Sequence, residues 1–265
     1  MTMADLGDLR LHYQRHGTAG GPPLVLAHAL GTDLRLFDAL VPLLPAELDI
    51  LRVDMRGHGL SDAPPGPYAM GALVRDLERL MDHLALRDAV LVGVSIGGMI
   101  AQGLAVKRLD LLRGLVLSNT GAKIGTRDLW RDRVAMLRDR GFGAVADATL
   151  ERWFPKAFRA SAEGAAWRNL LLRNDLKGYA ACAEAIAGTD FYTSTATLRL
   201  PTLGIAGSED SSTPPDLVRE TVDLIPGSRF ALVRNAGHLP CVDQPDAYGE
   251  LINGFLADIG HVGGK

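Results

Sequence analysis

The chain has 265 residues, 47% of them hydrophobic, which is enough to bury one full core; α/β folds of this length are commonly one domain with an insertion. Lysine and arginine total 28 against 31 acidic residues, and the net charge of −3 offers no field that would recruit nucleic acid or an anionic membrane. The two cysteines, Cys182 and Cys241, fit neither a metal-ligand spacing nor a disulfide framework. We therefore expect a small-molecule partner, no metal and no cofactor.

The first residues, Met1 to Asp5, lack a basic region followed by an apolar stretch, and no apolar run of 18 residues occurs in the chain. These features predict a cytoplasmic protein that does not enter a membrane. Nothing in the sequence indicates the oligomeric state.

The strands predicted in the first half change in character along the chain. Residues 9–13 alternate between apolar and polar, which is typical of a half-exposed antiparallel edge strand. Residues 23–27, 50–53 and 89–94 are continuous apolar runs, which are typical of buried parallel strands. Residues 68–84 carry one apolar helical stripe, and the polar residues Arg75, Asp76, Glu78 and Arg79 lie opposite it.

The second half predicts more strands, at residues 114–117, 202–206 and 230–233, each after a long connection typical of right-handed crossovers. A helix capped by the Thr213 hydroxyl begins near residue 215, another ends near residue 259, and residues 260–265 indicate a frayed tail. The pattern predicts an α/β fold with a mostly parallel sheet and helices on both faces.

The stretch from about residue 121 to residue 198 contains helical patterns and no convincing strand, and it holds all three tryptophans. An all-helical insertion between two parallel strands is expected to cover the carboxyl ends of the strands, where ligands bind. We predict a core in two parts, residues 1–122 and 198–265, with a helical cap over residues 123–197.

One motif combines a strand, a tight turn and a helix. Gly93-Val94-Ser95-Ile96-Gly97 follows the apolar run 89–94 and opens a helix of small residues over 97–106. This is the context of the nucleophile turn of α/β-hydrolases, in which glycines on either side of the serine avoid a collision between strand and helix. The alternative is a glycine-mediated packing contact with Ser95 as the helix N-cap.

A serine hydroxyl needs a base, and His238 is the best-placed histidine because it follows the strand at 230–233, at the same edge of the sheet as Ser95. Asp210 follows the strand at 202–206 and supplies the carboxylate that orients such a base. The order Ser95, Asp210, His238 is that of α/β-hydrolases, and Glu209 is the adjacent rival for the acid.

Two backbone amides, those of Leu30 and Ile96, are the candidates for an oxyanion hole. His28 lies in the same early loop and is interpreted as a residue that braces it. The polar segment 54–62 contains His58, which is either a second catalytic base or part of a brace tied by Arg56 and Asp54; the chain order favours the brace.

The chain resembles 3-oxoadipate enol-lactonases over nearly its whole length. Beyond the serine motif, the likeness rests on residues 30–34, 64–68, 118–125, 151–154 and 178–182. The resemblance implies hydrolysis of 3-oxoadipate enol-lactone to 3-oxoadipate in the β-ketoadipate pathway of aromatic degradation. The chain departs from the common family pattern at Ala27-His28-Ala29 and at Ile96, so a related lactonase or carboxylesterase of different specificity stays open.

Such a lactone carries a carboxylate, which needs a cation in an otherwise apolar pocket. The candidates at the start of the insertion are Lys123, Arg127, Arg131 and Arg133, and the sequence does not choose among them. Trp130 and Trp153 are predicted either to roof the pocket or to form the core of the cap. A non-enzymatic alternative is a ligand receptor on the same scaffold.

Overall fold

The computed structural model describes residues 1–263 and contains one eight-stranded sheet in the order β1-β2-β4-β3-β5-β6-β7-β8. The antiparallel pairs are β1 with β2 and β2 with β4, and every other neighbouring pair is parallel. The strands are β1 (Thr2–Asp5), β2 (Arg10–Gly17), β3 (Pro23–Ala27), β4 (Asp49–Val53), β5 (Ala89–Val94), β6 (Leu112–Ser118), β7 (Thr202–Gly207) and β8 (Arg229–Val233).

The connections between the parallel strands are helical. The α-helices are α1 (Met70–His83), α2 (Ile96–Lys107), α3 (Arg127–Arg140), α4 (Ala146–Trp153), α5 (Lys156–Arg159), α6 (Ala162–Leu172), α7 (Leu176–Ala187), α8 (Tyr192–Thr195), α9 (Pro215–Asp223), α10 (Pro240–Asp243) and α11 (Pro245–Asp258). Short 3-10 turns are η1 (Leu34–Phe37), η2 (Val41–Leu43), η3 (Leu109–Leu111) and η4 (Phe142–Ala144). The predicted α/β architecture is confirmed.

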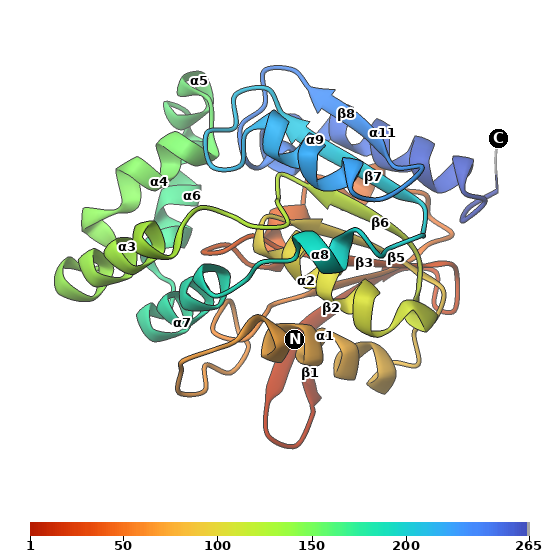
Figure 1. The fold of residues 1–265 in the computed structure, drawn as a ribbon, viewed down its shortest axis with the longest axis horizontal. Coiled ribbons are helices and arrows are strands. Elements are labelled where there is room, and N and C mark those ends of the chain that lie inside the picture. The colour runs from red at the N-terminus through yellow and green to blue at the C-terminus, as the bar shows by residue number, and fades with distance from the viewer. Residues whose placement is uncertain (264–265) are drawn as a thin grey trace.

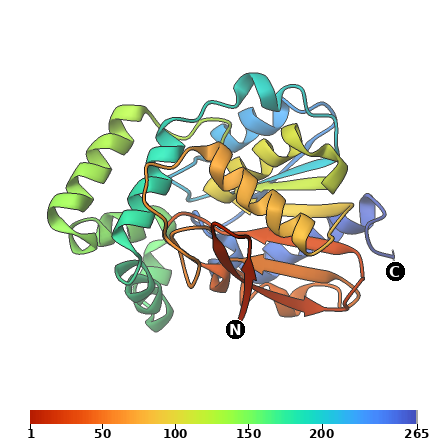
Figure 2. The same cartoon turned by 90° about the horizontal axis from the view of Figure 1, so that it is seen from below.

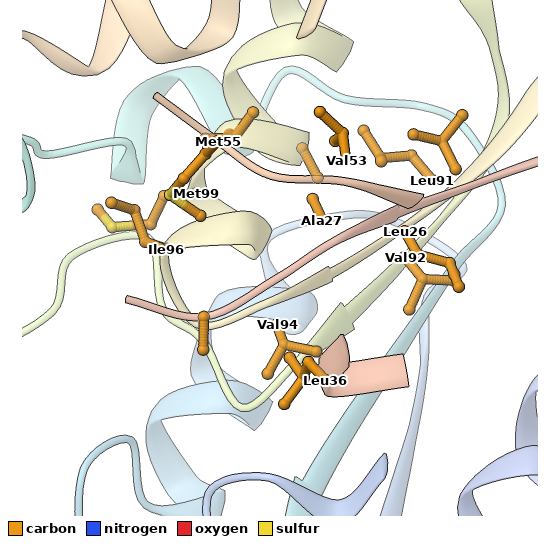
Figure 3. Packing of buried hydrophobic residues seen from close by; sticks show 14 of the residues in the cluster. Leu26, Ala27, Leu36, Val53, Met55, Leu91, Val92, Val94, Ile96 and Met99 are labelled. Carbon is orange, nitrogen blue, oxygen red and sulfur yellow. The ribbon is translucent and has the colours of Figure 1, made fainter. Parts of the chain in front are cut away.

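The centre of the sheet is covered on both faces, which explains the continuous apolar runs. Every residue of β4 and β5 is buried. In Figure 3, Val94 of β5 lies beside Leu36 of η1, whereas Leu91 points to the opposite face of the sheet. The helices α1 and α2 pack against each other, and α9 and α11 lie on either side of β7 and β8 (Figure 1).

The structure corrects the sequence predictions at both ends of the chain. The strand β2 is antiparallel as predicted, but β1 pairs with its outer side and forms the edge. Residues 260–265 were expected to fray, yet the His261 Nε2 atom donates to the Pro23 carbonyl at 2.9 Å and Val262 is buried. Packing against the start of β3 therefore orders residues up to 263, and residues 264–265 lie outside the described part.

The polar side of α1 is also less solvated than its pattern indicates. Asp76 and Glu78 are buried, because Asp76 accepts two hydrogen bonds from Arg56, at 2.5 and 2.7 Å, and Glu78 pairs with Lys107 and Arg108. The acidic side chains opposite the apolar stripe of α1 therefore form ion pairs with neighbouring elements instead of facing solvent.

Helices α3 to α8 all lie between β6 and β7, and no strand interrupts them. Figure 2 shows α3, α4, α6 and α7 gathered to one side of the sheet, beyond the carboxyl ends of its parallel strands. Within residues 1–263, no helix combines the length and the apolar character needed to cross a membrane.

Candidate active site

Ser95 occupies a strained turn between β5 and α2. Its backbone has φ +57° and ψ −118°, a combination that a residue with a side chain rarely adopts. A Cβ atom at Gly93 would lie 2.3 Å from the Gly97 carbonyl oxygen, and one at Gly97 would lie 2.2 Å from the Ala27 carbonyl oxygen. Both glycines are therefore required for this turn to pack against the sheet.

The hydrogen bonds that hold this turn in place use the backbone of Ser95 and not its hydroxyl group. The Ser95 amide donates to the Ser118 carbonyl at 3.0 Å, and the Thr120 hydroxyl donates to the Ser95 carbonyl at 2.6 Å. Ser95 stands at the N-cap position of α2, but its side chain makes no capping hydrogen bond. The N-cap interpretation therefore does not account for the hydroxyl.

Asp210 and His238 are in direct contact at the carboxyl ends of β7 and β8. The His238 Nδ1 atom donates to the Asp210 Oδ2 atom at 2.8 Å, and both residues are buried. With its proton on Nδ1, the imidazole keeps Nε2 free to act as a base. The rival carboxylate Glu209 is exposed.

Asp210 receives more hydrogen bonds than the sequence indicates. Asn119, at the end of β6, donates to Oδ2 at 2.8 Å, and the Thr213 hydroxyl donates to the same oxygen at 2.7 Å. Burial by itself raises the pKa of Asp210, but the His238 charge and the hydrogen bonds from His238, Asn119 and Thr213 outweigh it, so the pKa is lowered. The predicted cap role of Thr213 is wrong, because Pro214 is the N-cap and the Thr213 hydroxyl is used by Asp210.

Ser95 and His238 line one cavity of about 420 Å³. Its walls come from the carboxyl ends of the strands and from the helices between β6 and β7. They include Leu30, Trp130, Arg133, Arg152, Trp153, Tyr179 and Thr213. Both tryptophans that were predicted near the pocket therefore line it, and both are buried.

Two arginines stand at the helical side of this cavity. The Arg133 Nη2 atom donates to the Tyr179 hydroxyl at 2.8 Å and to the Thr149 hydroxyl at 3.0 Å, and the Arg152 Nη2 atom donates to Thr149 at 3.3 Å. Neither guanidinium forms a salt bridge within the described residues. Burial first, and then the charge of Arg133, lower the pKa of Arg152. The pair is thus a concentration of positive charge without a direct carboxylate partner among the described residues, although Asp132 also lines the cavity and Glu151 acts on Arg152 from a distance.

Of the cations predicted from the sequence, only Arg133 lines the cavity. The expectation for Lys123 is wrong, because its ammonium contacts Asp190 at 3.1 Å on the surface. The expectation for Arg131 is also wrong: it is 70% exposed, pairs with neighbouring aspartates, and shares an outer groove between α3 and α7 with Arg127. Arg152 was missed, although it lies within the segment 151–154 that carried the family resemblance.

Leu30 and Ile96, whose amides are the candidates for an oxyanion hole, lie near the serine in different ways: Leu30 lines the same cavity as Ser95, and Ile96 follows it in the chain. Ile96 is the first residue of α2, so its N–H has no acceptor within the helix. Leu30 lines the cavity, and the next amide, that of Gly31, donates to the His58 Nε2 atom at 3.0 Å. The loop that presents Leu30 is thus fixed from behind.

His28 and His58 brace this loop from within the core. The Met55 amide donates to the His28 Nε2 atom at 3.0 Å, and the His28 Nδ1 atom donates to the Ala29 carbonyl at 2.8 Å. Burial lowers the pKa of His58 to about 3, so it is a neutral acceptor for the Gly31 amide. Within residues 1–263, no group of three or more histidine, cysteine or acidic side chains could hold a metal ion.

The sheet order, the strained turn at Ser95 and the contact between Asp210 and His238 are together typical of alpha/beta hydrolases. Residues 24–251 match the model of the alpha/beta hydrolase family, and the chain belongs to this family. It is 30% identical to 3-oxoadipate enol-lactonase 2 of Acinetobacter baylyi, over 94% of both chains. The resemblance to 3-oxoadipate enol-lactonases that the sequence predicted is therefore confirmed.

Comparison with solved structures also identifies hydrolases as similar proteins. The enol-lactonase from Burkholderia xenovorans LB400 superposes with a TM-score of 0.93 at 33% identity and covers 97% of this chain and 100% of its own. An esterase from Thermogutta terrifontis has a TM-score of 0.89 at 29% identity, with 98% of both chains covered. The chain is thus a hydrolase-family protein whose relatives include both lactonases and esterases.

Proposed function

We propose that this protein is a serine hydrolase that opens the ring of 3-oxoadipate enol-lactone. The observation that carries the proposal is one cavity with a serine and an Asp-oriented histidine on the sheet side and two arginines without a salt-bridge partner on the helical side. The first end supports acyl transfer and the second supports recognition of an anionic substrate.

In the first half of the proposed reaction, the Ser95 Oγ atom attacks the lactone carbonyl carbon while the His238 Nε2 atom takes the hydroxyl proton. Asp210 keeps the imidazole in the required tautomer and stabilises the imidazolium that forms. The tetrahedral intermediate then collapses, the ring C–O bond breaks, and His238 returns the proton to the departing enol oxygen. The enol becomes a ketone, which draws the step forward.

In the second half, a water molecule attacks the acyl-serine ester and gives its proton to His238. The bond to the Ser95 oxygen breaks, the serine recovers its proton from His238, and the product leaves with a new carboxylate. The amides of Leu30 and Ile96 are proposed to hold the oxyanion in both halves. Loss of one such donor costs roughly 2.7 to 4 kcal/mol of activation free energy in comparable enzymes.

The substrate assignment rests on charge and on the relatives. 3-Oxoadipate enol-lactone carries a carboxylate, and Arg133 and Arg152 offer guanidinium groups whose side-chain hydrogen bonds go to hydroxyl groups rather than to a carboxylate. Trp130 and Trp153 supply the apolar walls beside them. The enol-lactonases of Acinetobacter baylyi and Burkholderia xenovorans resemble the chain over nearly its full length.

We also propose that residues 123–197 act as a cap on the cavity. The support for this division is that α3 and α4 contribute Trp130, Arg133, Arg152 and Trp153 to a cavity whose reactive end belongs to the sheet. In this interpretation the helices close the site over a bound lactone and exclude bulk water.

The test is kcat/KM of the purified protein on the enol-lactone and on neutral p-nitrophenyl esters, without added metal or cofactor. A strong preference for the lactone is expected. A preference for the neutral esters would replace the lactonase by a carboxylesterase, an activity that the similarity to the Thermogutta terrifontis esterase supports. Binding of the lactone without turnover would instead favour a receptor.

A further inference from the structure

Three hydrogen bonds hold the two peptide groups that flank the Cα atom of Gly237, the residue before His238. The Gly237 amide donates to the Asp243 Oδ2 atom at 2.7 Å, and the Asn119 side chain donates to the Gly237 carbonyl at 3.2 Å. The His238 amide donates to the Trp153 carbonyl, at the end of α4, at 2.8 Å. The main chain that carries the imidazole is therefore tied to three separate elements.

One of these three hydrogen bonds is accepted by the carboxylate of Asp243, a residue to which no other function has been assigned. Asp243 is the last residue of α10, and its second oxygen, Oδ1, is buried without a hydrogen-bond partner among the described residues. A buried carboxylate oxygen without a hydrogen bond lowers the stability of the folded protein, so an apolar side chain at this position would be more stabilising. Its one strong hydrogen bond goes to the residue that precedes His238.

We propose that Asp243 is a positioning residue for the hydrolytic reaction, whose carboxylate fixes Gly237 and thereby aims the His238 imidazole at Asp210 and Ser95. The inference rests on the proposed role of His238 as the base. Asp243 is not among the residues that line the substrate cavity, and its hydrogen bond goes to the Gly237 amide rather than to the imidazole, so the hydrogen-bonded route to His238 runs through the backbone.

The strength of this tie depends on the charge of the carboxylate. Burial raises the pKa of Asp243 to about 7, the Gly237 hydrogen bond opposes that rise, and the nearby charges of Glu209 and Asp210 add to it. The thiol of Cys241, on the same short helix, also lies beside it. A hydrogen bond to a carboxylate is stronger than one to a neutral acid, so the hold on Gly237 tightens as the pH rises through 7.

The first experiment removes the acceptor. Asp243→Ala is expected to lower kcat on p-nitrophenyl acetate by about 10-fold or more with KM within about twofold, because a small displacement of a catalytic group slows chemistry. The matched control is Asp246→Ala, an exposed aspartate on the next helix, which should keep kcat. Unchanged kcat in Asp243→Ala would overturn the inference.

The second experiment keeps the acceptor and removes the titration, in case the alanine variant does not fold. Asp243→Asn retains an oxygen for the Gly237 amide but carries no charge. The ratio of wild-type to Asp243→Asn kcat should be near one below pH 6 and rise to about three above pH 8, as the carboxylate ionises only in the wild type. A ratio that stays constant with pH indicates a merely structural residue and contradicts the proposal.

A spectroscopic measurement separates this inference from the proposed function. The Nδ1 proton that His238 shares with Asp210 should give a downfield NMR signal, assigned by its loss in His238→Gln. The His12 Nδ1 atom donates to Asp54 at 2.8 Å and supplies an internal reference. Asp243→Ala should broaden or shift only the His238 signal, and two unchanged signals would refute the positioning role. If Ser95→Ala keeps its activity, the proposed function fails instead.

Discussion

The two ends of the cavity are built in different ways. At the hydrolytic end, Ser95, Asp210 and His238 directly follow the strands β5, β7 and β8 or the turns after them, and backbone hydrogen bonds fix their main chain. At the cationic end, Arg133 and Arg152 extend from two helices and are held only through side chains such as Thr149. In the proposed reaction, sheet topology therefore positions the reacting groups, whereas recognition of the substrate charge depends on long side chains from the helices between β6 and β7.

The largest expected effect is at the hydrolytic end. Ser95→Ala should reduce kcat on any ester by at least about 10⁴-fold, because it removes the proposed nucleophile. Covalent labelling by an organophosphonate, read by mass spectrometry, should disappear with it. Ser211→Ala is the matched control, since Ser211 lines the same cavity and should leave labelling intact. Persistent labelling of Ser95→Ala would place the nucleophile elsewhere.

The next effect separates two adjacent carboxylates. Asp210→Asn should lower kcat by about 10³- to 10⁴-fold, because an amide facing the His238 Nδ1 atom favours the wrong tautomer. Glu209→Gln should change kcat by less than about twofold, since Glu209 is exposed and the Asp–His contact stays intact. The pair is compared by initial rates at saturating ester. The opposite ranking would exchange their roles.

The hydrolytic end could be predicted from the sequence because its signals are local. Continuous apolar runs mark the parallel strands, and the residues just after them must meet at one edge of the sheet. That rule identified Ser95, Asp210 and His238 as neighbours. It did not identify Asn119 as a partner of Asp210, because an uncharged strand-end residue carries no sign of which carboxylate it will bind.

The cationic end could not be predicted in the same way. Whether an arginine on a helix points into a cavity or towards solvent depends on the rotation and packing of that helix, which the sequence around α3 leaves open. Lys123 and Arg131 found acidic partners outside the cavity, and Arg152 on α4 reached Thr149 beside Arg133. Polar helices with many alternating charges give a weak apolar stripe, so the inward face is poorly defined.

Substitutions of the two cavity arginines, with a smaller expected effect, test whether recognition of the substrate charge can be changed without changing the hydrolytic reaction. Arg133→Gln and Arg152→Gln should each lower kcat/KM for the lactone by about 10- to 100-fold, the value of one charge-assisted hydrogen bond. The rate on neutral p-nitrophenyl acetate should change little. Arg131→Gln, on the outer face of α3, is the matched control and should affect neither substrate. Equal losses on both substrates would show that the arginines support the hydrolytic end rather than the substrate charge.

The smallest expected effect concerns the stability of the loop behind Leu30. His58 in the unfolded chain takes up a proton as the pH falls through 6.5, but in the folded protein its pKa is about 3. Its contribution to stability is therefore complete above pH 6.5 and is lost as the pH falls from 6.5 towards 3, at up to about 1.4 kcal/mol per pH unit.

His58→Gln should remove that part of the acid sensitivity, because a glutamine can accept from the Gly31 amide without titrating. The free energy of unfolding, measured by urea titration at pH 7 and pH 5, should fall less in the variant than in the wild type. His83→Gln, an exposed histidine at the end of α1, should leave the difference between the two pH values unchanged. Identical pH dependence in all three proteins would mean that His58 is not held neutral. The loop that carries Leu30 would then not owe its fixed backbone to an uncharged imidazole behind it.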